Sequence, residues 1–192
     1  MRFMALIAAA VSAALLSTAP ASAYGGGVTF GMSRHTLIHV ADDIDYSMPL
    51  IALGITALHH EDWTGAAQFT VLEALTVGTS YGIRSFVKKT SPDGTDKRSF
   101  PSMEAAIASP ASGYLWRRYG WEYGLPTFVI KHMAGYWLDR AGKHKLTDTL
   151  PVLAMSLGFN MFITTRYHKP IEVGVAQADD GTPMLAMRMT LD

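Results

Sequence analysis

The sequence predicts an all-α fold, a bundle of about five to six helices that is followed by a short C-terminal β-hairpin. Apolar segments of helical length fill most of the chain. Glycine, proline and charged residues, which favour loops, gather between these segments. Beyond Pro170, apolar and polar residues alternate, as is typical of paired strands. We therefore expect one helical domain with a small β tail.

The chain begins with a segment that is typical of secretory signals. Arg2 supplies the positive start, an apolar stretch follows from Phe3 to Leu16, and Ala21-Ser22-Ala23 offers a small-residue cleavage site. We expect residues 1–23 to be a signal peptide, 24–169 the helical domain and 170–192 the tail. An amino-terminal membrane anchor is the alternative for the first segment, although its apolar stretch is short for a span.

The elements follow from local signals. Pro49 suits a first helical turn, Ser102 can cap the helix after it, and Asp179-Asp180-Gly181 favours a turn between strands. The expected helices are His35–Asp43, Met48–His60, Trp63–Val87, Met103–Tyr119, Pro126–Leu138 and Thr147–Arg166, and the expected strands are Ile171–Ala176 and Met184–Leu191. A basic loop with two prolines, Lys88–Pro101, separates the third and fourth helices. A basic turn, Asp139–Lys145, precedes the last helix.

Composition excludes several classes of protein. Of 192 residues, 49% are hydrophobic and 17% are charged, a balance that excludes a disordered chain. No cysteine is present, which excludes a disulfide scaffold, a thiolate metal site and a cysteine nucleophile. Sixteen basic and sixteen acidic residues argue against nucleic acid as a partner.

Hydropathy leaves the relation to a membrane open. The longest stretch without a charged residue after the signal segment is Thr149–Thr165, which contains Pro151 and Asn160. This stretch is shorter than the 18 or so apolar residues that identify a span, and it also suits a buried helix. A soluble or peripheral protein is favoured, and an integral membrane protein is the alternative.

Two segments contain residues that can bind metal ions, but their patterns favour a structural role. His59-His60-Glu61-Asp62 ends a predicted helix, where adjacent residues point in different directions and cannot all converge on one metal ion. The methionines near the C-terminus offer thioether ligands, but no histidine lies beside them, so apolar packing is favoured. We therefore predict no metal site.

A third segment has the residues for nucleophilic chemistry. His144 and Asp148 are one helical turn apart, so the carboxylate can hold one imidazole nitrogen and leave the other as a nucleophile or base. Lys143, Lys145 and Arg140 make the surroundings favourable for an anion.

Ser91 to Ser102, which reads Ser-Pro-Asp-Gly-Thr-Asp-Lys-Arg-Ser-Phe-Pro-Ser, resembles part of the first two motifs of the type 2 phosphatidic acid phosphatases. That superfamily also contains bacterial acid phosphatases and vanadium haloperoxidases. Its motifs read Lys, six residues, Arg-Pro; then Pro-Ser-Gly-His; then Ser-Arg, five residues, His, three residues, Asp. The resemblance covers roughly residues 40–160. It implies a helical bundle with its site at one end, and a phosphohistidine mechanism without metal or other cofactor.

Matched residue by residue, the resemblance gives a partial site. His144 and Asp148 match the nucleophile and the carboxylate that orients it, and Arg84 falls where the first lysine of the motif stands. Ser102 is kept, whereas Glu104 replaces the general-acid histidine. Ser91 and Leu138 replace the two arginines, with Arg140 two positions after the second. The phosphate-binding residues are therefore expected to be Arg84, Ser102 and Arg140.

Three functions follow as hypotheses. The first is an exported, phosphatase-like protein whose activity is reduced or lost and which binds a lipid or an envelope protein. The second is a working phosphohydrolase with a rearranged site that uses His144 and Asp148 on a phosphate ester or a phospholipid head group. The third is a non-enzymatic binding or assembly protein of the envelope. The signal segment places all three in the periplasm or the cell envelope, with the possibility of membrane association.

Overall fold

The computed structural model describes residues 30–59, 61–168, 172–177 and 182–188. Five α-helices run along the bundle, α2 Arg34–Leu53, α3 Trp63–Phe86, α4 Met103–Tyr119, α5 Trp121–Arg140 and α6 Leu146–Ile163. A short π-helix, η1 Gly54–His59, extends α2. The strands β1 Glu172–Gln177 and β2 Pro183–Arg188 pair antiparallel, with Val175 opposite Leu185. The all-α prediction, with its paired strands at the C-terminal end, is confirmed. The predicted signal peptide and the turn at 179–181 lie outside the described residues.

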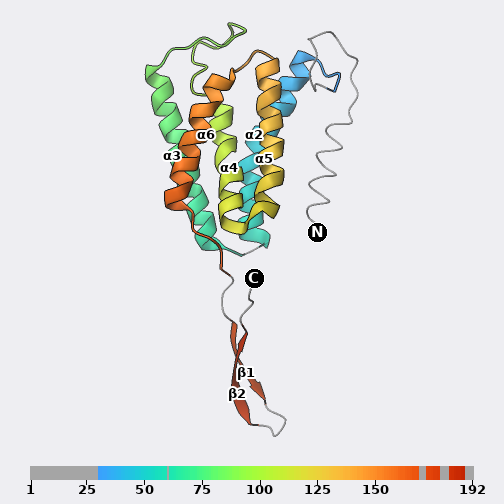
Figure 1. Cartoon of the computed structure of the whole chain (residues 1–192), viewed down its shortest axis with the longest axis vertical. Coiled ribbons are helices and arrows are strands. Elements are labelled where there is room, and N and C mark those ends of the chain that lie inside the picture. Colours follow the sequence, from blue (N-terminus) through green and yellow to red (C-terminus); the bar gives the residue numbers. More distant parts are fainter. Residues whose placement is uncertain (1–29, 60, 169–171, 178–181, 189–192) are drawn as a thin grey trace.

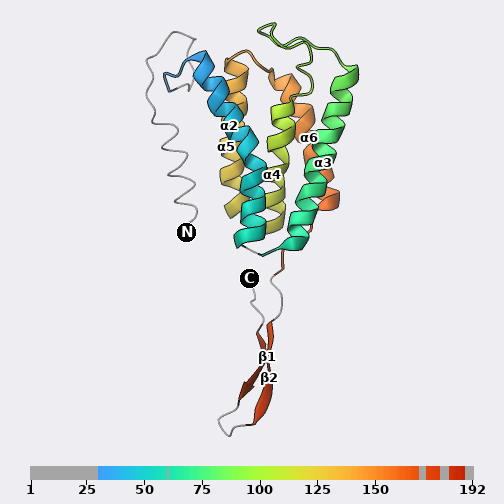
Figure 2. The same ribbon diagram turned by 180° about the vertical axis from the view of Figure 1, so that it is seen from behind.

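Helix α4 lies at the centre of the bundle and packs against α2, α3, α5 and α6. It appears between its neighbours both from the front (Figure 1) and from behind (Figure 2). Small residues such as Ala108 and Ala111 are fully buried along it, because they let the surrounding helices approach closely. Larger core side chains fill the space around them, with Met48 from α2, Phe69 from α3 and Tyr114 from α4 itself.

The start of the bundle differs from the prediction. The sequence predicts two helices, His35–Asp43 and Met48–His60, but the structure has one continuous helix that includes Pro49. A proline inside a helix removes one backbone hydrogen bond and costs about 3 kcal/mol. Met48 and Ala52 on either side of Pro49 are buried in the core, so packing offsets this cost.

Helix α5 also begins earlier than predicted, at Trp121 rather than Pro126. Gly120 turns the chain between α4 and α5 with φ 102°, a conformation that favours glycine. Gly124 lies directly against Trp116, and a Cβ atom there would come within 2.3 Å of the Trp116 Cβ. The close corner therefore depends on these two glycines, which propensity alone does not reveal.

Two connections meet at one end of the bundle. The loop from α3 to α4 and the turn from α5 to α6 both lie at the upper end in Figure 1. Two backbone hydrogen bonds fasten them: the Asp93 amide donates to the Gly142 carbonyl at 3.1 Å, and the Ser102 amide donates to the Asp148 carbonyl at 3.1 Å. A third, from the Ser99 amide to the Lys89 carbonyl at 2.7 Å, closes the loop between α3 and α4 on itself. These bonds fix where the loop's side chains stand relative to the first turn of α6.

Candidate functional site

His144 is buried in the turn before α6 and has a partner at each ring nitrogen. Its Nε2 lies 2.8 Å from Glu104 Oε2, and its Nδ1 lies 3.1 Å from the Ser99 hydroxyl. Glu104 stands in the first turn of α4, and Ser99 comes from the loop between α3 and α4. Ser99 and Glu104 are close to each other in the sequence but 45 and 40 residues from His144, and both contact its imidazole, which is 3% exposed.

Asp148 reaches His144 through Ser99. The Ser99 hydroxyl donates to Asp148 Oδ2 at 3.0 Å, and the same hydroxyl oxygen contacts His144 Nδ1. The Lys145 amide also donates to Oδ2 at 3.0 Å, and the Lys89 ammonium pairs with Oδ1. Burial alone would raise the pKa of Asp148, but these donors outweigh it and hold the pKa below its ordinary value. Asp148 is therefore an ionised, fixed acceptor.

Ser99 is the residue of this cluster that the sequence did not single out. It is fully buried, and its single hydroxyl joins the imidazole to the carboxylate. Its position next to Arg98 in a basic loop gives no signal of such a role. Only the docking of the loop onto the start of α6 shows it.

Glu104 has three partners and no free oxygen. Oε1 lies 3.0 Å from the Lys143 ammonium, and Oε2 accepts from His144 and, at 3.3 Å, from the Ser102 hydroxyl. Burial would raise the pKa of Glu104, but the hydrogen bond and charge of His144 and the charge of Lys143 hold the pKa well below its ordinary value. Glu104 is therefore a carboxylate throughout the physiological range.

The partners of His144 assign the donors and acceptors around its ring. The Ser99 hydroxyl has one hydrogen and gives it to Asp148, so His144 Nδ1 must be the donor in its contact with Ser99. An ionised Glu104 can only accept, so His144 Nε2 is a donor as well. This pattern assigns His144 as the donor to both Ser99 and Glu104.

The predicted phosphate-binding residues have separate partners. Arg84, at the end of α3, donates to Asp96 at 2.6 Å within the loop. Arg140, in the last turn of α5, has a buried Nε without a hydrogen-bond partner in the described part of the protein. Ser102 caps α4 by accepting from the Ala105 amide at 3.2 Å. The contacts of the described residues therefore join Ser102 to the His144 cluster through Glu104, pair Arg84 with Asp96, and place Lys89 and Lys143 on the carboxylates of the cluster.

The segment before α3 has a structural role. Asp62 caps α3 through the Gly65 amide at 2.8 Å and pairs with the buried Arg118, while His60 lies outside the described residues. Among the methionines near the C-terminus, Met184 is 53% exposed. Over the described residues, no group of three or more His, Asp or Glu side chains is placed to hold a metal ion.

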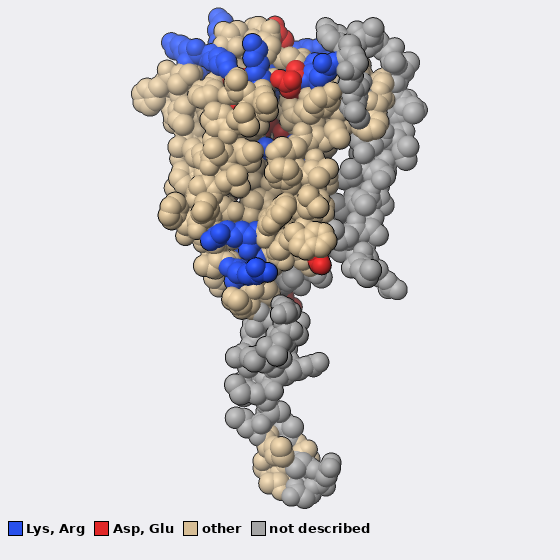
Figure 3. Space-filling view, in the orientation of Figure 1, with Lys and Arg blue, Asp and Glu red and all other residues tan. Residues whose placement is uncertain are grey.

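The outer surface separates charged ends from an uncharged middle. In Figure 3, basic and acidic side chains gather at the end that holds the site, a second basic group lies near the opposite end, and the face between them carries few charges. Large apolar side chains of α6 are exposed, among them Leu150, Leu157 and Met161. Of the helices that the structure describes, α6 has the length and apolar composition to cross a membrane, and 22% of it is buried.

Comparison with known proteins gives one informative likeness. No family model matches the chain, and no solved structure matches it. The chain is 26% identical over 128 residues to a lipid A 4'-phosphatase of Helicobacter pylori strain J99. The match covers 61% of this chain and 65% of the relative, so the relative extends well beyond the matched part. This likeness supports a distant relation between the chain and the phosphatases that act on lipid phosphates.

Proposed function

We propose that this protein is a phosphatase-like protein of the cell envelope that meets lipid phosphate groups and in which Glu104 suppresses hydrolysis. The observation that carries the proposal is the contact of 2.8 Å between Glu104 Oε2 and His144 Nε2. The likeness to a lipid A 4'-phosphatase supports the lipid phosphate as the ligand class. The predicted signal segment and the apolar surface of α6 support the location in the envelope.

The contact bears directly on the chemistry. In a phosphohistidine mechanism a ring nitrogen must offer a lone pair to phosphorus, and the opposite nitrogen must be held by a partner. Ser99 and Asp148 hold Nδ1, which leaves Nε2 as the nucleophile. Nε2 instead donates to Glu104 and has no lone pair available. An incoming phosphate would also meet the negative charge of Glu104 at the same position.

The hydrogen bond between Glu104 and His144 gives the size of the expected loss in hydrolysis rate. A hydrogen bond to a charged group contributes roughly 1.5–3 kcal/mol net. Breaking it before attack would slow hydrolysis by roughly 10- to 150-fold, at about 1.4 kcal/mol for each tenfold change in rate. Repulsion between Glu104 and the phosphate adds to this, and the charge of Arg84 is already paired with Asp96.

The test compares hydrolysis by the full chain and its variants on phosphatidate, on lipid A and on a soluble phosphomonoester. We expect the wild-type rate to lie within a few-fold of the His144→Ala rate. Glu104→Gln, which keeps the shape and removes the charge, should raise the rate by roughly 10- to 150-fold. Glu122→Gln is the matched control, because Glu122 is exposed in the first turn of α5.

A second function, a working phosphohydrolase with a rearranged site, is favoured by one observation. Asp148 and Ser99 are held as an intact orienting pair for His144, with Lys89 on the carboxylate. In that case wild-type hydrolysis would exceed the His144→Ala rate by 100-fold or more, and Ser99→Ala would reduce it. Quenching the reaction with alkaline detergent, in which the acid-labile N–P bond survives, would then trap a phosphohistidine. Such a result would contradict the suppressing role of Glu104.

A further inference from the structure

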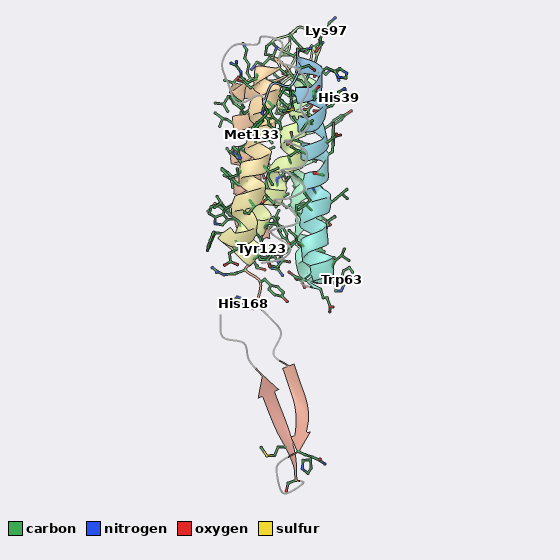
Figure 4. All side chains as sticks on the ribbon, turned by 90° about the vertical axis from the view of Figure 1, so that its right-hand side faces the viewer. His39, Trp63, Lys97, Tyr123, Met133 and His168 are labelled. Atoms are coloured by element: carbon green, nitrogen blue, oxygen red, sulfur yellow. The ribbon has the colours of Figure 1, made fainter. Side chains whose placement is uncertain are left out.

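Two histidines near the start of α2 lie on one exposed face of the helix. His35 and His39 are four residues apart, so their side chains are neighbours along the surface. Both are exposed, and Figure 4 labels His39 on the outer side of α2, away from the core. Their Nε2 atoms are 2.9 Å apart and their ring centroids are 4.2 Å apart.

The distance between the two Nε2 atoms can be compared with the spacing of two histidine ligands on one metal ion. Two imidazole lone pairs that face each other repel unless a proton or a metal ion lies between them. Bonds of about 2.0–2.1 Å from histidine to a metal ion separate two adjacent nitrogens by about 2.8–3.0 Å when the bonds form a right angle. A tetrahedral angle would require about 3.3–3.4 Å. The observed 2.9 Å is that of a hydrogen bond between the two rings, and the same spacing fits neighbouring positions around a square-planar or octahedral ion that replaces the proton.

The surrounding charges suit a cation. Arg34, next to His35, donates to the Ala141 carbonyl at 2.7 Å and pairs with Asp93. Lys143 pairs with Asp42 at 2.9 Å, so its charge is compensated. The exposed Asp43 follows His39 by one further turn and adds negative charge to the same stripe of the helix.

We propose that His35 and His39 form a two-histidine chelate for a divalent copper or nickel ion, with water in the remaining positions. These ions favour nitrogen ligands in tetragonal geometry, which has right angles between neighbouring ligands. The site shares no residue with the His144 cluster and does not depend on the proposed hydrolase chemistry. Because the ion clips the first two turns of α2 in the folded state, it stabilises the native chain.

The experiment titrates the full chain, purified without a polyhistidine tag, with copper(II) and with nickel(II) salts. Calorimetry gives the stoichiometry, and electron paramagnetic resonance of the copper complex reports bound imidazole nitrogen. We expect one ion per chain, nitrogen splitting from two imidazoles, and a higher melting temperature in the presence of the ion. His35→Ala and His39→Ala should each weaken binding by tenfold or more.

The control variant is His132→Ala. His132 lies on α5, where its Nδ1 is 2.7 Å from the Phe128 carbonyl. The His132→Ala variant should therefore bind the ion as tightly as the wild type does. Circular dichroism of each variant without metal checks that the helices persist. Unchanged affinity in either single variant, a copper spectrum without two imidazole nitrogens, or loss of binding in His132→Ala would overturn the proposal. These outcomes are independent of the hydrolysis assays, because the proposed metal site uses His35 and His39 and the assays test His144 and Glu104.

Discussion

At the scale of single residues, Glu104 decides the chemical character of the site. Its carboxylate is held by Lys143, Ser102 and His144, so it occupies the space beside His144 Nε2, the nitrogen that attacks phosphorus in the proposed mechanism. Through the same three contacts, the Glu104 carboxylate stabilises the folded state. The Glu104 carboxylate thus compensates positive charge beside it, such as that of Lys143. In the motif that the sequence resembles, a histidine stands at this position.

The pKa of Glu104 leads to a prediction on stability. Because the folded state lowers this pKa, the contribution of Glu104 is complete above the ordinary glutamate value near 4.3 and is lost as the pH falls toward the folded value. Between pH 5 and 6 we expect the wild type to exceed Glu104→Gln by about 1.5–3 kcal/mol in unfolding free energy. The difference should shrink below pH 4. Urea unfolding at each pH measures it, and a difference that grows with acidification would contradict the assignment.

At the scale of the elements, the end of the bundle opposite His144 is held by a polar cluster around Asp62. Arg118 and Tyr119 of α4 both donate to this carboxylate, which also caps α3. Gly65 is packed against the cluster: a Cβ atom there would come within 2.5 Å of the Tyr114 hydroxyl and of Arg118 Nε. The contact of α3 with α4 therefore requires a glycine at this position.

Replacement of this glycine tests the packing. We expect Gly65→Ala to lower the unfolding free energy by about 1–3 kcal/mol, because the added methyl group displaces the buried ion pair. Gly78→Ala is the matched control on the same helix, since nothing lies within 4 Å of a Cβ atom there. The control should be stabilised by about 0.4–1 kcal/mol. Equal effects of the two substitutions in thermal or urea unfolding would show that Gly65 has no special contact.

At the scale of the whole molecule, charge and apolar surface occupy different zones. Charged side chains gather at the two ends, and the face between them carries few charges (Figure 3). Large apolar side chains of α6 are exposed, among them Leu157 and Met161. An apolar surface of this extent needs a cover, and lipid is the cover that the proposed function supplies.

This distribution leads to a prediction on fractionation. We expect the chain from Tyr24 onward, exported with its own signal segment, to stay in the membrane pellet through a wash with 1 M NaCl and to require detergent for release. Salt screens electrostatic attraction over about 3 Å at this concentration and leaves apolar contacts intact. Release by salt alone would show that only the basic ends hold the protein at the membrane.

The sequence by itself determined the helical class, the loop between α3 and α4, and the cap of α4 by Ser102. The helix Met103–Tyr119 was predicted with its observed bounds from the capping serine Ser102, and the structure shows that Gly120 ends it. The sequence did not predict that α2 continues through Pro49, nor that α5 begins at Trp121. In both places tertiary packing outweighs the local preference of a proline.

Only the tertiary structure decided how the candidate site is arranged. Spacing alone placed His144 and Asp148 one turn apart, but the described contact between them runs through Ser99, and Arg84 is directed to Asp96. Glu104 and His144 are 40 residues apart, and they meet because the start of α4 packs beside the turn before α6. Local sequence encodes backbone preferences over a few residues, whereas the direction of a buried side chain depends on partners that the fold brings from distant segments.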